Sequence, residues 1–572
     1  MNKQFKMIWS YKAVILLFLY AVLLMQGCSK STNGGELLLG DKTRLTVSVL
    51  GIVEGGVIGN KGQSLATKAA VKPGLAIASE IVSHIEGFDS RFSVVEDEFK
   101  GDRMVSISNN DKEGTATTVR AESMSNGIYY HLIVYKVSDN SVVASQVMRS
   151  GDAVQIIVDG GVQYKWVAFS YNTAVAADLP AVADPAAPVV SMGQNKDFLY
   201  ASGTITVNSL NTPLGIVFSH KLARIGVELN TMGMFADLNT ATVVNENQLK
   251  TGNFNLLTGT VTGALTTIAT ASTSTFTRPT AYGFDDRSTA YFYTADPASL
   301  PNLNIKLTGL SIKLDAYAVS QSQATRNFGV LSTVYSSPNF VPVLGQSKTF
   351  RIDLLESPIT TTSNNGGAVV TRWARANLYY VSGDHNPYRF HHLNQKTQDN
   401  NTFFAFGAIH PQTYATEGAE ADPCALVYPT GVWRQATRSD YQGLVGRSIL
   451  EGGFISAKTP TRVAGQYLEY AAVGTASPYP TNAVRFNLNG SAVGVSLVVG
   501  LIDLNFGFYG QNAEVWTSTS LISLPPLVSL GAIHYEATGT THGLVTDILD
   551  LQLLGAVNVV KSNFMNVRCV RN

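Results

Sequence analysis

Three histidines lie close together in a polar stretch of the C-terminal third of the chain: His385, His391 and His392. Imidazole nitrogens can hold a metal, but a zinc site needs defined spacing and a supporting carboxylate or further histidine. The same stretch could contact a ligand such as a glycan, together with the rings of Trp433 and Trp516. We expect no metal and no cofactor. Ligand contact and an ordinary polar loop remain as alternatives.

The sequence lacks the other common catalytic patterns. It contains no His-Glu-x-x-His pair, phosphate-binding loop, Gly-x-Ser-x-Gly elbow or EF-hand loop. A reactive cysteine site would need thiols that are not already bridged. We therefore expect a protein that is not an enzyme.

The first of three cysteines, Cys28, follows an apolar run from Ala13 to Met25 with lysines before it. That pattern is typical of a secretory signal and is too short to span a membrane. The Gly27-Cys28 pair resembles the lipobox of bacterial lipoproteins. The resemblance implies a signal peptide over 1–27, lipid (palmitate) on Cys28 and an outer-membrane location. An uncleaved anchor and ordinary signal-peptidase cleavage are the alternatives.

Cys424 and Cys569 remain once Cys28 is lipidated. In an oxidising compartment two remaining cysteines favour a disulfide. Closing so long a loop would stabilise by roughly 4–5 kcal/mol in the chain-entropy model. Two separate buried thiols are the alternative.

The composition limits the possible partners and the number of domains. The 572 residues carry a formal net charge of zero, and only 14% are charged, against about 25% in a typical soluble domain. Without a basic excess, nucleic acid is not an expected partner. The length favours three domains.

Alternating apolar and polar residues predict β-strands through the first two thirds. Leu303, Ile305 and Leu307 give one such set, and Gly309 is a position where the strand could bend. The fold class we predict is mainly β: two tandem antiparallel β-sandwich domains followed by an α+β C-terminal domain. The predicted divisions are a tether over 28–40, sandwiches over 41–196 and 197–356, a linker over 357–367 and a C-terminal domain over 368–572.

Three segments at 164–172, 197–201 and 218–229 resemble the fimbrillin family of bacterial pilus proteins in order and spacing. The resemblance implies lipoprotein precursors with two β-sandwiches. It also implies assembly by strand exchange, in which an arginine-directed protease removes the first strand and another subunit's strand fills the groove. Arg44 and Leu45 flank a place where such a cut could fall.

The C-terminal domain contains Asp422-Pro423-Cys424 and Val567-Arg568-Cys569-Val570. These sequences resemble the Fibrobacter succinogenes major paralogous domain. The resemblance implies an α+β fold akin to C-type-lectin and formylglycine-generating folds. In that resemblance both cysteines belong to recurring motifs, which agrees with a disulfide.

Local patterns in this domain predict one helix and one strand. Thr437 and Asp440 are spaced as a helix N-cap and its third residue, with Asp in place of Glu. Tyr441, Leu444, Val445 and Ile449 then share one helical face. The apolar stretch 493–502 is predicted to be a buried strand.

The leading hypothesis is a cell-surface pilus lipoprotein, an accessory or tip subunit whose C-terminal domain mediates adhesion to a glycan or protein. Its partners would be other pilus subunits, through strand exchange, and the membrane, through the lipid. A chain tied back at Cys569 is a poor donor strand, which favours the tip or accessory role. The alternative is a permanently lipid-anchored binding protein that never enters a pilus.

Overall fold

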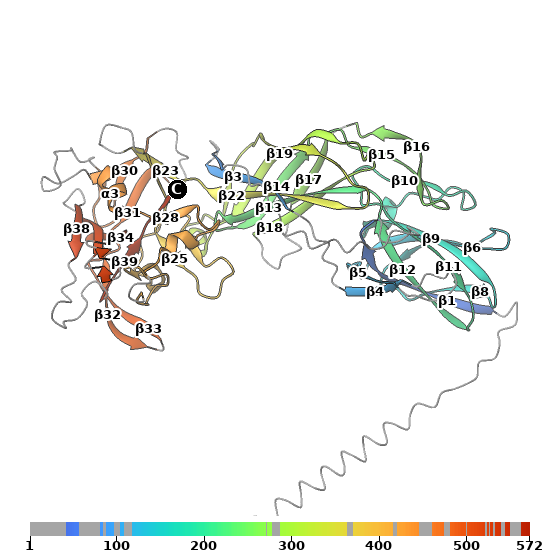
Figure 1. Cartoon of the computed structure of the whole chain (residues 1–572), viewed down its shortest axis with the longest axis horizontal. Coiled ribbons are helices and arrows are strands. Elements are labelled where there is room, and N and C mark those ends of the chain that lie inside the picture. Colours follow the sequence, from blue (N-terminus) through green and yellow to red (C-terminus); the bar gives the residue numbers. More distant parts are fainter. Residues whose placement is uncertain are drawn as a thin grey trace, which may run out of the picture.

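The structure is a computed structural model that describes residues 42–55, 81–83, 87–95, 103–107, 117–269, 271–276, 286–362, 370–415, 420–445, 460–473, 481–498, 500–520, 523–524, 527–529, 532–538, 544–548 and 562–572. These residues form two β-sandwiches and a C-terminal domain in a row (Figure 1). The fold is mainly β, as predicted. The predicted signal peptide 1–27, Cys28 and the tether to residue 40 lie outside the described residues. No helix among the described residues is both long and apolar enough to cross a membrane.

The first sandwich is built on a seven-stranded sheet that curls around its own core. Across the sheet its strands are β7 (Val142–Arg149), β6 (Tyr129–Lys136), β9 (Gln163–Thr173), β11 (Leu199–Thr206), β12 (Asn211–His220), β1 (Lys42–Val53) and β8 (Val154–Asp159). Every one of these strands contributes to one hydrophobic cluster, and the two edge strands, β7 and β8, contact each other. The hairpin of β4 (Arg103–Ile107) and β5 (Thr117–Ala121) lies beside β1.

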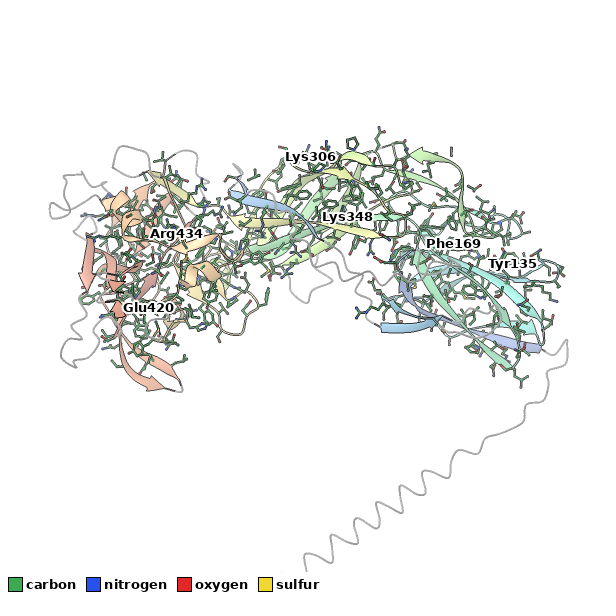
Figure 2. All side chains as sticks on the ribbon, in the orientation of Figure 1. Tyr135, Phe169, Lys306, Lys348, Glu420 and Arg434 are labelled. Atoms are coloured by element: carbon green, nitrogen blue, oxygen red, sulfur yellow. A yellow bond between two sulfur atoms is a disulfide. The ribbon has the colours of Figure 1, made fainter. Side chains whose placement is uncertain are left out.

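A small sheet covers the outer face of β6, β9 and β11. Its strands are β10 (Val189–Ser191), β15 (Lys250–Asn255) and β16 (Thr260–Thr267). The layer between the sheets is aromatic: the ring of Phe254 lies 5.0 Å from those of both Phe198 and Tyr200. Figure 2 marks Tyr135 and Phe169, which belong to the same layer. The layer also includes Leu222 and Ala295, which flank strands of the second sandwich, so it joins the two sandwiches.

His131 on β6 is buried beneath this small sheet. Its ring stacks on Phe169 at 5.7 Å, its Nε2 lies 2.9 Å from the Ser145 hydroxyl, and burial lowers its pKa. His131 therefore binds a proton more tightly in the unfolded chain than in the folded chain. The stability that neutral His131 contributes is fully present above about pH 6.5 and is lost as the pH falls below that value.

We expect acid to weaken the first sandwich less when this group is removed. Between pH 7.5 and 5.5 the free energy of unfolding of the parent protein should fall more steeply than that of His131→Gln, by up to about 1.4 kcal/mol per pH unit. Calorimetry at matched ionic strength measures the difference. Parallel pH profiles would show that His131 does not contribute.

The second sandwich has two sheets around the largest core. One sheet consists of β18 (Arg287–Thr294), β13 (Ala223–Gly233), β22 (Ser347–Glu356), β3 (Phe88–Val95) and β2 (Val82–Ser83). The other consists of β17 (Ser272–Phe276), β14 (Asp237–Asn245), β19 (Leu300–Lys313) and β20 (Thr325–Asn327), with β21 (Thr333–Phe340) also on β19. The predicted alternation on β19 is confirmed, and its register against β14 shifts between Gly309 and Leu307.

The sheets divide the chain at a different place from the predicted boundary at residues 196 and 197. Strands β11 and β12 still belong to the first sandwich, whereas β2 and β3 already belong to the second. Each sandwich also contains a parallel pair, β1 with β12 and β13 with β22, which the sequence analysis did not predict. Alternation of apolar and polar residues predicts a strand but not which strand it pairs with. The pattern alone therefore could not predict these parallel pairs or the sheet to which each strand belongs.

The C-terminal domain packs several small sheets around a shared core. One sheet is β23 (Ile359–Thr362), β24 (Val370–Trp373), β40 (Cys569–Arg571) and β28 (Trp433–Gln435). A larger sheet is β33 (Leu501–Gly507), β32 (Ser491–Val498), β39 (Asn563–Val567), β34 (Asn512–Ser520), β37 (Ala532–Thr538) and β38 (Leu544–Ile548), with β27 (Phe404–Ala405) on β39. The rest are β29 (Thr461–Val463), β30 (Tyr467–Ala471) and β31 (Ala483–Asn487), and the pairs β25 (Leu378–Tyr380) with β26 (Tyr388–Phe390) and β35 (Ser523–Leu524) with β36 (Leu527–Ser529).

The helical segments among the described residues are short. They are η1 (Ala176–Asp178), α2 (Ala316–Ser320), η2 (Asn400–Thr402), η3 (Pro423–Leu426) and α3 (Arg438–Val445). The predicted cap of α3 is confirmed, because the Thr437 hydroxyl accepts from the Asp440 N–H and the Asp440 carboxylate accepts from the Thr437 N–H. Tyr441 and Leu444 are buried as expected, and Ile449 lies outside the described residues.

Two local predictions in this domain are wrong. The stretch 493–502 is not a buried strand: it spans the turn between β32 and β33, and Val495 is 57% exposed. The predicted linker over 357–367 begins with strand β23, whose Ile359 is buried in the C-terminal core. A run of Thr residues favours a strand as readily as a linker.

Candidate functional site: first strand and domain junction

Strand β1 fills the space between β8 and β12 in the first sandwich. It pairs antiparallel with β8 and in parallel with β12 over most of its length. Leu45 and Val47 point into the core and are at most 3% exposed. The Thr43 hydroxyl donates to the Val158 carbonyl at 3.1 Å. Without β1, the sheet would have a groove lined by apolar side chains.

The predicted processing site lies inside this strand. Arg44 is exposed and donates to the Gln155 side chain at 3.0 Å, whereas Leu45 is completely buried. A cut between them would remove only the first three residues of β1. No arginine occurs between Arg44 and Arg91, and Arg91 lies within β3. Cleavage at either arginine therefore cannot release β1 alone.

The chain leaves β1 through a tight glycine contact at the border between the sandwiches. The Gly55 N–H donates to the Gly345 carbonyl at 2.7 Å, and a Cβ on Gly55 would lie 2.4 Å from the Gly345 Cα. The carbonyl of His220 closes the same space. The His220 ring is buried, with Nδ1 2.7 Å from an Asp197 oxygen. This places His220 in a structural role.

Strand β40 occupies an interior position in its sheet. It pairs with β24 on one side and with β28 on the other. Cys569 at its start forms the predicted disulfide with Cys424, with an S–S distance of 1.98 Å and a Cα–Cα distance of 5.6 Å. Both cysteines are fully buried. Because both its edges are used and one end is covalently fixed, β40 is not free to pair with another chain.

Arg571 at the end of β40 binds the second sandwich. Its guanidinium donates to the Asp89 carboxylate on β3 and to the Glu356 carbonyl on β22, and it lies 4.6 Å from the ring of Trp433. Burial lowers the pKa of Arg571 to about 9. Glu356 in turn pairs with Arg326 at 3.3 Å and Arg375 at 3.1 Å. A buried cluster of three arginines and two carboxylates therefore joins the second sandwich to the C-terminal domain.

We expect Arg571→Met to destabilise the junction strongly. It leaves the Asp89 carboxylate buried without this guanidinium, and breaking one side of a buried pair typically costs about 3–5 kcal/mol. Chemical denaturation followed by tryptophan fluorescence measures the loss. The control is Arg372→Met, because Arg372 is exposed and lies opposite Arg571 on β24. Equal effects of the two substitutions would contradict the assignment.

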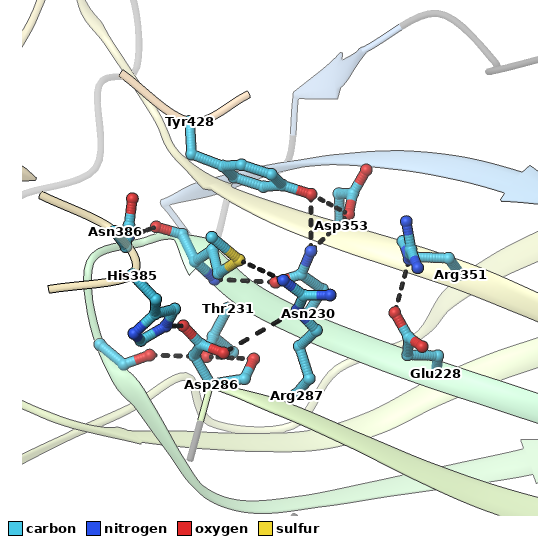
Figure 3. Close-up of polar contacts among 12 residues, drawn as sticks. Glu228, Asn230, Thr231, Asp286, Arg287, Arg351, Asp353, His385, Asn386 and Tyr428 are labelled. Atoms are coloured by element: carbon cyan, nitrogen blue, oxygen red, sulfur yellow. Dashed lines mark hydrogen bonds and ion pairs between the residues drawn. The ribbon is translucent and has the colours of Figure 1, made fainter. Parts of the chain in front are cut away.

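A second polar cluster joins the same two domains through the histidine stretch (Figure 3). His385 Nε2 lies 2.5 Å from the Asp286 carboxylate, and the Asn386 side chain donates to the Met232 carbonyl at 2.9 Å. Beside them, Asn230 donates to Asp353 at 2.9 Å and to the hydroxyl of Tyr428 at 2.7 Å. That hydroxyl donates to Asp353 at 3.1 Å. Since His385, Asn386 and Tyr428 belong to the C-terminal domain, these bonds cross the junction.

The other two histidines surround Asp315, the N-cap of α2. His392 is buried, with Nε2 3.1 Å from the Met234 carbonyl, while Nδ1 accepts from the Asp315 N–H at 3.1 Å. His391 stacks on Tyr379 with ring centroids 3.9 Å apart. Burial alone would raise the pKa of Asp315. The nearby rings of His391 and His392 and the hydrogen bond from the Ala318 N–H outweigh burial and hold that pKa well below its ordinary value.

The proposed ligand contacts are therefore corrected. Trp433 and Trp516 are at most 1% exposed and therefore cannot contact a ligand at the surface. The Trp516 indole donates to the Phe404 carbonyl at 2.9 Å. The three histidines make interdomain contacts, which a sequence pattern does not distinguish from a ligand loop. Within the described ranges, no group of three or more His, Cys, Asp or Glu side chains is arranged to hold a metal ion.

The described residues thus form two β-sandwiches, with the first strand inserted between β8 and β12, followed by a C-terminal domain bound to the second sandwich through buried polar clusters. Residues 93–373 match the Fimbrillin-like family. This region, just under half of the chain, is therefore similar to that family. No curated protein sequence matches the chain.

Solved structures of three bacterial proteins are similar to part of the chain. A candidate cell adhesion protein from Bacteroides fragilis is 12% identical, covers 47% of this chain and 92% of its own, and has a TM-score of 0.28. A fimbrial assembly protein from Parabacteroides distasonis is also 12% identical, with coverages of 43% and 86% and a TM-score of 0.20. The fimbrial anchor protein Mfa2 from Porphyromonas gingivalis is 12% identical, with coverages of 32% and 71% and a TM-score of 0.18.

Proposed function

We propose that the protein is a terminal pilus subunit, at the tip or in an accessory position, made as a lipoprotein precursor. The observation that carries this proposal is the interior position of β40, paired on both sides and fixed by the Cys424–Cys569 disulfide. Such a strand cannot be donated, whereas a shaft subunit must both donate and accept. The Fimbrillin-like match over 93–373 supports the pilus context.

The accepting position in this proposal is the place of β1. A strand that replaced β1 would pair with β8 and β12 and insert alternate apolar side chains where Leu45 and Val47 lie. Main-chain bonds would supply affinity and the buried side chains specificity. The C-terminal domain, at the far end of the row in Figure 1, would be the exposed adhesive part.

A reversible lock on β1 tests this proposal. Thr46 and Gln155 face each other across the antiparallel β1–β8 pair and are not buried. The double variant Thr46→Cys, Gln155→Cys should form a bridge that holds β1 in place. We expect the oxidised variant to be excluded from filaments, and the reduced form and each single variant to enter them. Equal incorporation of the oxidised and reduced forms would overturn the proposal.

The alternative is a permanently lipid-anchored surface protein that binds a glycan or another protein and enters no pilus. One observation favours it: the absence of arginine between Arg44 and Arg91, because an arginine-directed protease then leaves most of β1 in place. In both proposals Cys28 carries lipid at the outer membrane. The two proposals differ in whether residues 28–53 remain in the mature protein.

A further inference from the structure

One corner of the C-terminal domain presents aromatic side chains to solvent. The turn between β33 and β34 contains Phe508, which is 55% exposed, and Tyr509, which is 46% exposed. The exposed amide residue Gln511 follows in the same turn. We call Phe508, Tyr509 and Gln511, together with Lys396 and Gln466, the aromatic corner. Of the phenylalanines whose burial the structure describes, Phe508 alone is exposed.

The turn is held rigidly. The N–H groups of Gln511 and Asn512 both donate to the Phe508 carbonyl, at 2.9 and 3.0 Å, and the Gly510 N–H donates to the Leu488 carbonyl at 2.8 Å. Gly490 lies so close to the start of this turn that a Cβ on it would be 1.9 Å from the Gly507 carbonyl oxygen. The aromatic side chains are therefore carried on a fixed backbone.

Phe508 has an unusual backbone conformation, with φ of 59°. A bulky residue other than glycine is rarely found there, because the left-handed region crowds its Cβ. Such a conformation persists when the surroundings impose it, and it is frequent at binding sites. The folded protein thus holds a phenylalanine in a strained conformation without burying its ring.

A cationic side chain lies against one of the two rings. Lys396 places its ammonium 4.0 Å from the centroid of the Tyr509 ring and donates to the Gly465 carbonyl at 2.7 Å. This bond brings the turn that contains the exposed Gln466 next to Gly510. The Tyr509 ring thus lies beside an ammonium group, and the exposed residues Gln466 and Gln511 belong to the two adjoining turns.

We propose that the aromatic corner binds a saccharide. The C–H face of a pyranose ring can stack on Phe508 or Tyr509, while its hydroxyl groups bond to the amides of Gln466 and Gln511. A protein partner fits less well, because a stable protein interface needs about 20–30 residues on each side. This inference deepens the proposed function, on which it rests, by giving the adhesive domain a ligand class and a site.

The full-length protein on an array of defined oligosaccharides tests the inference. We expect selective binding that Phe508→Ala, Tyr509→Ala weakens at least about tenfold for the best-bound oligosaccharide. The control is Tyr317→Ala, which removes an aromatic side chain that is also exposed (38%) but lies on α2 in the second sandwich. Matching melting temperatures would show that all forms are folded. No array binding by the parent protein, or equal binding by the double variant, would overturn the inference.

The same variants separate this inference from the proposed function. We expect the double variant to enter filaments like the parent protein but to lose binding to saccharide-coated surfaces. A parent protein that binds saccharide yet never enters filaments would refute the pilus role and leave the site standing. A double variant that keeps saccharide binding but loses attachment to cells would assign the corner to a protein partner and overturn the saccharide site.

Discussion

Removal of residues 28–53 is expected to unfold the first sandwich while the second sandwich stays folded. Strand β1 contributes Leu45, Val47, Ile52 and Val53 to buried positions, each at most 3% exposed. Deleting one large buried side chain typically costs about 2–5 kcal/mol, and a whole domain is stable by only about 5–15 kcal/mol. The core of the second sandwich contains no residue of β1.

A peptide with the sequence of Lys42–Val53 should restore the truncated protein. We expect it to bind the empty groove and return the lost calorimetric transition, because it can reform both ladders with β8 and β12. The matched control peptide carries Leu45→Asp and Val47→Asp, which put charges into the core. Equal rescue by both peptides, or a truncated protein that melts like the parent, would show that β1 is not an exchangeable strand.

Loss of the disulfide is expected to have the second large effect. The Cys424–Cys569 bridge closes a loop with a sequence separation of 145, for which the chain-entropy model gives about 5 kcal/mol. Cys424→Ser, Cys569→Ser should also weaken the junction, because Cys569 starts the strand that carries Arg571. Urea denaturation with and without reductant measures both effects.

The matched control is Cys28→Ser, which removes a thiol outside the described domains. Reductant should destabilise the parent protein and the Cys28→Ser variant alike, and should leave the double variant unchanged. A double variant as stable as the oxidised parent would contradict a stabilising role for the bridge.

Several features of the fold could be predicted because they depend on local sequence. The alternation of Leu303, Ile305 and Leu307 predicted a strand with one buried face, and all three side chains are fully buried. Thr437 and Asp440 predicted the start of α3, because a capping box needs only residues three apart. The disulfide followed from the compartment and from the resemblance of both cysteine motifs.

The remainder depended on contacts between distant segments. Strand β3 joins the second sandwich although β1 before it belongs to the first, and alternation is the same in both cases. The histidines at 385, 391 and 392 look like a polar loop until Asp286 and Asp315 are placed opposite them. The exposure of Phe508 follows from one turn conformation, which a sequence pattern does not reveal.

The most direct test of the central claim is the N-terminus of the mature protein, measured by mass spectrometry on sheared filaments and on washed membranes. If β1 is replaced on assembly, filament-bound protein should lack residues 28–53 and begin between Glu54 and Gly87, while membranes contain the lipidated Cys28 form. A lipidated Cys28 as the N-terminus everywhere, or filament-bound protein that begins at Leu45 and so retains β1, would contradict strand exchange in this groove.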